Sequence, residues 1–206
     1  VGDLCVKHNV LVVSDEIHSD FTWPGHEHHV FANLDPKYAE ISITCTAPSK
    51  TFNLAGLQTS NIFIPNRTLR KTFKKAIDQA GYSQLNTLGL VACQAAYEEG
   101  EPWLTELKKY LLENLDFSRD YIERNLPGVH LIEPEGTYLI WLDFRDLRLP
   151  EEKLEHLITK EAKLWLDSGA IFGTDGEGFE RINIACPRTT LKEAFDRLAK
   201  ALNSLG

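Results

Sequence analysis

The chain has 206 residues, 43% of them hydrophobic and 25% charged, which is typical of a globular protein with a sizeable core. It has 22 basic and 30 acidic side chains, so its formal net charge is −8, and no basic run offers a nucleic-acid surface. No apolar run is long enough to span a bilayer and no signal-peptide pattern opens the sequence, so we expect no membrane partner.

Two further features of composition bear on where the chain resides and how it begins. The four cysteines, at positions 5, 45, 93 and 186, show neither a CxxC pair nor metal-ligand spacing. We read them as buried thiols in a reducing compartment, which predicts a cytoplasmic location. Methionine is absent and the opening residues, VGDLCVKHN, resemble the last turns of a helix. We therefore expect a piece of a longer protein; a chain from which the start residue was removed is the alternative.

The first part of the chain predicts strands alternating with helices in an α/β arrangement. The run VLVVS at residues 10–14 is continuously apolar and β-branched, which predicts a strand buried on both faces of a parallel sheet. Further strands are expected at 41–45 and 59–64. Amphipathic helices are expected at 66–80 and 85–99. A long helix is expected at 101–125, opened by Pro102 and ended before Pro127.

The second part of the chain predicts a smaller α+β unit. Strands are expected at 129–132, 137–144 and 178–185, and helices at 150–162 and 191–202. We place the boundary between the two parts near the end of the long helix, which predicts domains at 1–120 and 121–206.

Two charged residues directly follow predicted strands. Asp15 follows VLVVS and Lys50 comes soon after ISITC, so both belong at the carboxyl ends of strands, where open α/β sheets bind ligands. His18 lies three residues beyond Asp15. An aspartate for a pyridinium nitrogen and a lysine for an aldehyde are what pyridoxal phosphate chemistry requires. A polar loop that closes a strand and a solvated lysine are the alternatives that these residues leave open.

The segment HEHH at residues 26–29 suggests a metal site, but it lies in a polar loop without an acidic or cysteine partner at helical spacing. We therefore predict no metal.

The segments SDEIHSDF (14–21), APSKTFNLAGLQTSN (47–61) and RINIACPRTTL (181–191) carry a family resemblance. They resemble the motifs of fold-type I pyridoxal-phosphate enzymes of the aminotransferase class I/II type, and most of all the cystathionine β-lyase/C–S lyase (MalY/PatB) group. The resemblance runs along the whole chain but covers only the C-terminal part of such an enzyme. It implies an α/β fold with part of the large cofactor-binding domain in 1–120, including the start of the interdomain helix, and the small domain in 121–206.

The resemblance also implies roles for single residues. Lys50 matches the lysine that holds the cofactor aldehyde, Asp15 the partner of the pyridine nitrogen, and His18 a position near the ring hydroxyl. Ser49 is expected to donate to the cofactor phosphate. Arg181 matches the arginine that binds the substrate carboxylate, with Arg188 as a weaker second candidate.

One departure from the related aminotransferases favours the lyase group. In the pattern K-x(5)-G-x-R, Lys50 and Gly56 fit, but Gln58 replaces the arginine that binds phosphate. The implied reaction is β-elimination from cystathionine or a cysteine-type amino acid, and the implied assembly is a homodimer. The alternatives are transamination on the same residues and a non-catalytic remnant that acts only as a structural or protein-binding module.

Overall fold

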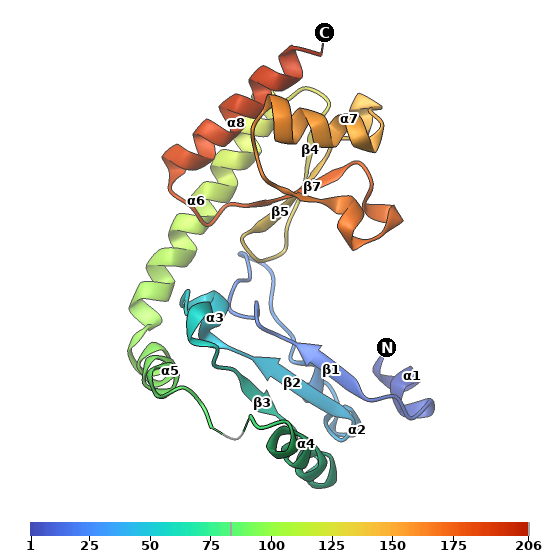
Figure 1. Cartoon of the computed structure of the whole chain (residues 1–206), viewed down its shortest axis with the longest axis vertical. Coiled ribbons are helices and arrows are strands. Elements are labelled where there is room, and N and C mark those ends of the chain that lie inside the picture. The colour runs from blue at the N-terminus through green and yellow to red at the C-terminus, as the bar shows by residue number, and fades with distance from the viewer. Residues whose placement is uncertain (83, 206) are drawn as a thin grey trace. The chain divides into compact units, whose positions relative to one another are not determined.

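The computed structural model describes residues 1–82 and 84–205 (Figure 1). They form two compact units, Val1–Glu106 and a second that starts at Leu107. The first unit contains α1 (Gly2–Lys7), β1 (Val12–Asp15), α2 (Pro36–Ala39), β2 (Ser42–Thr46), α3 (Pro48–Thr51), β3 (Asn61–Phe63), α4 (Arg67–Gln79) and α5 (Thr87–Glu99). Short 3₁₀ turns lie at Phe31–Asn33 and Ala55–Leu57.

The sheet of the first unit has the order β1-β2-β3. Strands β1 and β2 are parallel, with Val12 opposite Ser42 and Asp15 opposite Cys45. Strand β3 pairs with the other side of β2 in the antiparallel direction. The expected parallel pair is confirmed, and the mixed sheet follows from a third strand that returns along β2.

Strand β1 is less buried than its apolar sequence predicts. Val13 is 66% exposed and Leu11, just before the strand, is 55% exposed, whereas Ser42 on β2 is fully buried. The prediction of a strand buried on both faces is therefore wrong for the described residues. The cause is that no described segment covers the face of the sheet on which Val13 lies.

The second unit contains most of the long helix α6 (Glu101–Asn125) and a sheet with two further helices. Its elements are β4 (His130–Ile132), β5 (Leu139–Asp143), α7 (Glu151–His156), a π-helix (Leu157–Glu161), β6 (Asp167–Ser168), β7 (Phe179–Asn183) and α8 (Arg188–Asn203). Three 3₁₀ turns lie at Arg145–Leu147, Gly169–Phe172 and Thr174–Gly176. The sheet has the order β4-β5-β7-β6, and its pairs are antiparallel.

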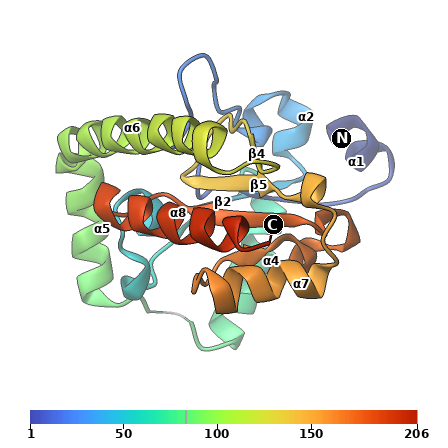
Figure 2. The ribbon, with the colours of Figure 1, turned by 90° about the horizontal axis from the view of Figure 1, so that it is seen from above.

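Helices α6 and α8 run side by side along the sheet of the second unit (Figure 2). The Tyr121 and Phe195 rings stack with centroids 5.3 Å apart, and the Tyr121 hydroxyl donates to Asp196 Oδ1 at 2.6 Å. Asn114, fully buried on α6, donates to the carbonyl oxygens of Ile184 and Cys186 at 2.7 and 3.0 Å. The turn between β7 and α8 is thereby fixed to α6, because every polar atom of that amide has a partner once Arg188 donates to its oxygen.

The expected helix at 150–162 differs from the structure in one respect. It consists of α7 followed by a π-helix, in which the amide of Ala162 donates to the carbonyl oxygen of Leu157, five residues earlier, at 2.8 Å. Among the described residues, no helix combines the length and apolarity needed to cross a membrane.

Candidate active site

The fold places Asp15 and Lys50 at the ends of neighbouring strands. Asp15 is the last residue of β1 and lies opposite Cys45 in the parallel register. Strand β2 ends one residue later, and Lys50 follows in the single turn of α3. Because parallel strands end at the same edge of a sheet, the two side chains leave the same edge, as the sequence predicts.

The side chain of Asp15 is exposed, and a backbone amide two residues later helps to orient its carboxylate. Its Oδ1 accepts a hydrogen bond from the amide of Ile17 at 3.3 Å, which closes a small turn after the strand. In the described chain, Oδ2 has no hydrogen-bond partner. Burial raises the pKa of the Cys45 thiol opposite Asp15, and the nearby carboxylate raises it further. One carboxylate oxygen of Asp15 is thus available to a nitrogen of a bound molecule.

Lys50 is exposed on α3, which begins with Pro48 in the first turn, where a proline stabilises the helix start. No described side chain forms a salt bridge or hydrogen bond with the Lys50 amine. Ser49 is half-buried beside it, and its carbonyl oxygen accepts from the amide of Leu54 at 3.1 Å. The amine of Lys50 is therefore held on a short, defined turn and remains free to react.

The two segments that carry these residues are joined directly. The hydroxyl of Thr51, a side chain only 1% exposed, donates to Asp20 Oδ2 at 2.6 Å. His18 is half-buried between Asp15 and Asp20, with its ring centroid 6.5 Å from that of the buried Phe21. The expected group of Asp15, His18, Ser49 and Lys50 therefore comes from two adjoining segments of one unit.

Glu16 is a site residue that the sequence reasoning did not single out. Its carboxylate accepts hydrogen bonds from the Ser14 hydroxyl at 2.9 Å and the Phe31 amide at 3.1 Å, and it contacts His28 Nε2 at 3.0 Å. Burial raises the pKa of Glu16, but these three partners outweigh burial and hold its pKa below the ordinary value. Its position inside the SDEIHSDF segment was the sequence feature that could have drawn attention to Glu16. A carboxylate that is buried needs hydrogen-bond partners, which it finds here in Ser14, Phe31 and His28.

The contact with Glu16 gives the HEHH segment a structural role. His28 anchors the loop after Phe21 to the end of β1, beside Asp15. In the described residues, no three metal-ligating side chains lie close enough together to hold an ion.

Gln58 adopts the left-handed conformation with φ 52° and is exposed, directly after the 3₁₀ turn that ends at Leu57. Helix α5 approaches this turn closely. A Cβ on Gly89 would lie 2.9 Å from the carbonyl oxygen of Leu57 and 2.2 Å from Thr59 Oγ1. Only a glycine at this position permits the approach, so α5 supports the turn that follows the Lys50 segment.

Arg181 lies in the second unit, on β7. Its Nε and Nη2 donate to Asp167 Oδ2 at 3.1 and 2.7 Å, and its guanidinium carbon lies 4.7 Å from the centroid of the Phe172 ring. Asp167 thereby occupies one side of the guanidinium. The Nη1 end has no hydrogen-bond partner among the described residues, which leaves the fork geometry that suits a carboxylate.

Arg188, the second arginine candidate, is engaged within its own unit. Its Nε donates to Asn114 Oδ1 at 2.7 Å, and its guanidinium lies 4.9 Å from the centroid of the Phe117 ring. These contacts hold the start of α8 against α6.

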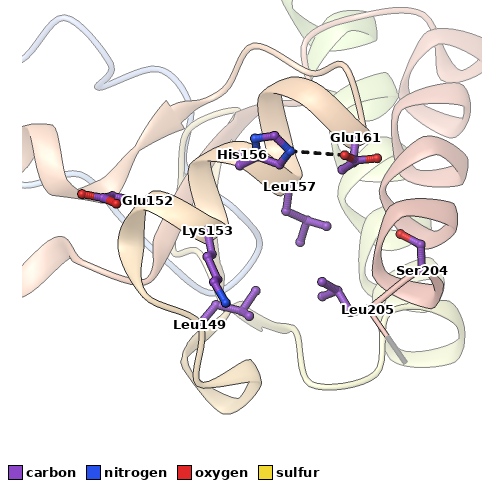
Figure 3. Close-up of a pocket in the computed structure, with 8 residues that line it drawn as sticks. All are labelled: Leu149, Glu152, Lys153, His156, Leu157, Glu161, Ser204 and Leu205. Carbon is purple, nitrogen blue, oxygen red and sulfur yellow. Dashed lines mark hydrogen bonds and ion pairs between the residues drawn. The ribbon is translucent and has the colours of Figure 1, made fainter.

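A cavity of about 670 Å³ in the second unit contains none of the expected site residues (Figure 3). It lies between α7, the π-helix and the end of α8, and His156 Nε2 contacts Glu161 Oε1 across it at 3.3 Å. Its lining mixes both signs of charge with leucine side chains, so it gives no further support to the expected site.

Residues 1–198 match the family described as aminotransferase class I and II. The chain belongs to this family. Its curated relatives include the cystathionine beta-lyase PatB of Bacillus subtilis (strain 168), 43% identical over 98% of this chain and 52% of that protein. The protein MalY of Escherichia coli (strain K12) is 33% identical over 100% of this chain and 52% of that protein. The family resemblance expected from the motifs is thus confirmed.

Solved structures of this aminotransferase family agree with the fold. Cystalysin from Treponema denticola, a structure that contains pyridoxal 5′-phosphate, has a TM-score of 0.95 at 41% identity, covering all of this chain and 52% of that one. A PLP-bound putative aminotransferase from Clostridium difficile 630 also has a TM-score of 0.95, at 43% identity over 98% of this chain and 52% of that one. The expected fold-type I α/β fold is confirmed, and the chain spans about half the length of these relatives.

Proposed function

We propose that this chain contributes the C-terminal part of a pyridoxal-phosphate-dependent carbon–sulfur β-lyase. The substrate class is cystathionine or a related cysteine-type amino acid, and the products are a thiol, pyruvate and ammonia. The observation that carries the proposal is the placement of Asp15 and Lys50 at the ends of two neighbouring parallel strands. The relatives described as cystathionine beta-lyase support the reaction class.

The described residues fit the cofactor. The Lys50 amine has no competing protein partner and is suited to bind an aldehyde, and the free Oδ2 of Asp15 is suited to accept from a protonated pyridine nitrogen. His18 and Ser49, on the same two segments, would contact the ring hydroxyl and the phosphate. When bound, pyridoxal phosphate supplies an electron sink for charge that develops at the substrate Cα.

In the proposed reaction, residues of this chain bind the substrate and move its proton. Arg181 binds the substrate carboxylate through the guanidinium end that Asp167 leaves open. With the cofactor bound, Lys50 would take the proton from the substrate Cα as a general base. The Cβ–S bond breaks and its electron pair leaves with the sulfur as a thiolate, which takes up a proton. The remaining three-carbon fragment takes up water and yields pyruvate and ammonia.

Two other functions use the same observations. Transamination requires the same Cα deprotonation, and a relative described as an aspartate aminotransferase is 29% identical to this chain. A non-catalytic module is the reading favoured by the exposed apolar side chains around β1, such as Val13. We also propose a homodimer for the whole enzyme, because sites of this fold type are usually built across two subunits; sedimentation of the whole enzyme tests it.

The first test is a visible absorption spectrum of the purified 206-residue chain after addition of pyridoxal phosphate. A new visible band is expected in the wild type and not in Lys50→Ala. Lys71→Ala is the matched control, because it removes an exposed lysine from α4, away from the strand ends. An equal band in Lys50→Ala would contradict the assignment of this lysine.

A second test measures pyruvate release from cystathionine by the whole enzyme, without a keto-acid acceptor. Release under these conditions supports elimination, whereas turnover only with an acceptor supports transamination. Lys50→Ala is expected to abolish either activity, because the same amine moves the Cα proton in both. If neither the chain nor the whole enzyme forms the visible band or turns over substrate, the non-catalytic module is the better description.

A further inference from the structure

The second unit contains another cavity, of about 400 Å³, which none of the candidate cofactor residues lines. It lies beside α7, the π-helix and β6, and residues from β7 and the 3₁₀ turn at Gly169–Phe172 complete its wall. This volume is within the range of small-molecule sites.

Glu180 is the unusual residue of this cavity. It lies on β7, is only 2% exposed, and has no hydrogen-bond donor among the described residues. Burial, together with the smaller effect of the neighbouring carboxylates of Glu151, Glu155 and Asp167, raises the pKa of Glu180 to about 7. Near neutral pH this side chain therefore carries a partial negative charge in a buried place without a positive partner.

The charged side chains near Glu180 either have other hydrogen-bond or ion-pair partners or are negatively charged themselves. Glu151 accepts from the Ser168 hydroxyl at 2.8 Å and from the Gly178 amide at 2.9 Å. Asp167 pairs with Arg181. Glu155 adds a third carboxylate, and Lys160 on the π-helix is the basic residue of the cavity wall, with no ion pair to Glu180. A cation that enters the cavity would therefore meet negative charge that the described residues leave uncompensated.

The remaining wall is apolar and aromatic. The indole of Trp165 is 95% exposed at the cavity, Ile171 is 68% exposed, and Ile158 lies deeper at 2%. An exposed tryptophan in the same cavity wall as the buried carboxyl group of Glu180 suits an organic cation, which gains from the face of the indole and from contact with aliphatic side chains. A metal ion fits less well, because no group of three ligating side chains exists in the described chain.

From this combination we infer that the cavity beside Glu180 binds a small alkylammonium ion. The ammonium group contacts the Glu180 carboxylate, and its short hydrocarbon chain lies against Ile158, Ile171 and the indole of Trp165. This site uses neither Lys50 nor Asp15, and Asp167 in its wall is the residue that pairs with Arg181.

Calorimetric titration of the full chain with n-butylammonium chloride at pH 8 tests the site, with n-butanol as the uncharged probe of the same length. Saturable binding is expected for the ammonium and not for the alcohol. At pH 5.5 the affinity is expected to fall roughly 30-fold, because protons compete for a carboxyl group whose pKa is about 7. Equal binding of both probes, or no saturation with n-butylammonium, would overturn the proposal.

Two variants locate the ligand. Glu180→Gln keeps the shape of the side chain, removes its charge, and is expected to weaken binding at least tenfold. Glu177→Gln makes the same charge change at an exposed residue three positions earlier and is expected to bind as the wild type. Trp165→Ala, at an exposed position that cannot unfold the unit, is expected to weaken binding several-fold. If Glu180→Gln does not fold by circular dichroism, Trp165→Ala decides, and wild-type affinity in it contradicts the site.

Discussion

Thr51 and Asp20 join the two segments that carry the candidate cofactor residues, through a hydrogen bond of 2.6 Å between hydroxyl and carboxylate. Thr51 follows Lys50 directly, and Asp20 lies two residues after His18. The hydroxyl is buried while Asp20 is exposed, so the bond fixes the lysine turn to a segment that solvent also reaches. This bond therefore sets the spacing of the candidate site without contacting a cofactor.

Replacing Thr51 by valine keeps the side-chain shape and removes the donor. We expect the free energy of unfolding to fall by about 1.5–3 kcal/mol, the range for a hydrogen bond to a charged group. The amide of Phe52, which donates to Pro48, is expected to exchange faster with solvent. Urea unfolding and hydrogen exchange measure both. Thr72→Val is the control, since that hydroxyl bonds only within its own helix; an equal loss in both variants would contradict the role of the Thr51–Asp20 bond.

Glu16→Gln removes the charge that holds the loop at His28 and Phe31. We expect a loss of about 1–3 kcal/mol near neutral pH, because half-buried donors lose a charged acceptor. Since the folded-state pKa of Glu16 is lowered, its contribution is present above its ordinary pKa of 4.5 and is lost as the pH falls through the folded value. Urea unfolding at pH 7 and pH 3 should therefore show a difference that shrinks in acid.

Glu27→Gln provides the comparison for this prediction, because Glu27 is exposed in the same loop. A loss as large as that of Glu16→Gln would mean that the net charge of the loop matters, and not the specific contacts of Glu16.

Arg181→Lys keeps the positive charge and removes the planar fork. In the whole enzyme we expect KM for cystathionine to rise on the order of tenfold to a hundredfold, as 1.5–3 kcal/mol of charged hydrogen bonding is lost. The value of kcat is expected to change less, since Arg181 holds the substrate carboxylate in both ground and transition states. Steady-state kinetics measure the split. Arg124→Lys, at an exposed residue of α6, should leave both constants unchanged, and unaltered KM in Arg181→Lys would remove it from the substrate site.

Glu180 should make the second unit more stable in mild acid. Its folded-state pKa, about 7, lies above its ordinary value of 4.5, so the folded form holds its proton more tightly than the unfolded form. Its contribution is fully present below pH 4.5 and is lost as the pH rises through 7, by at most about 3 kcal/mol. Urea unfolding of wild type and Glu180→Gln at pH 5 and pH 8 tests this. A difference between the two proteins that does not change with pH would contradict it.

The sequence predicts the regular elements well where a long pattern exists. Helix α6 occupies Glu101–Asn125, the range expected from its amphipathic pattern and its proline and glycine signals. The strand-end argument also brings Asp15 and Lys50 to one sheet edge as expected. Their chemical roles, and a domain boundary near residue 120, stay predictions that the experiments above address.

Other features depend on contacts between distant segments, which local patterns do not contain. Strand β6 has only two residues and forms because Asp167 pairs with Arg181, fourteen positions later. A strand this short has no sequence periodicity from which it could be predicted. The exposure of Val13 depends on what covers the sheet and not on its own segment. The importance of Glu16 arises from Phe31 and His28, which reach it from a loop.

The pairing of Asp15 with Cys45 limits how this part of the chain can change in length. Neighbouring residues of a strand point to opposite faces of the sheet, so a single residue inserted within Val12–Asp15 would turn the carboxylate to the other side. The loop at Gly25 is not part of a strand, and added side-chain atoms there would meet open space. An inserted residue in this loop would not change which face of the sheet a side chain occupies. In related sequences we therefore expect insertions and deletions in the loop at Gly25, whereas the strand Val12–Asp15 is expected to vary by substitution alone.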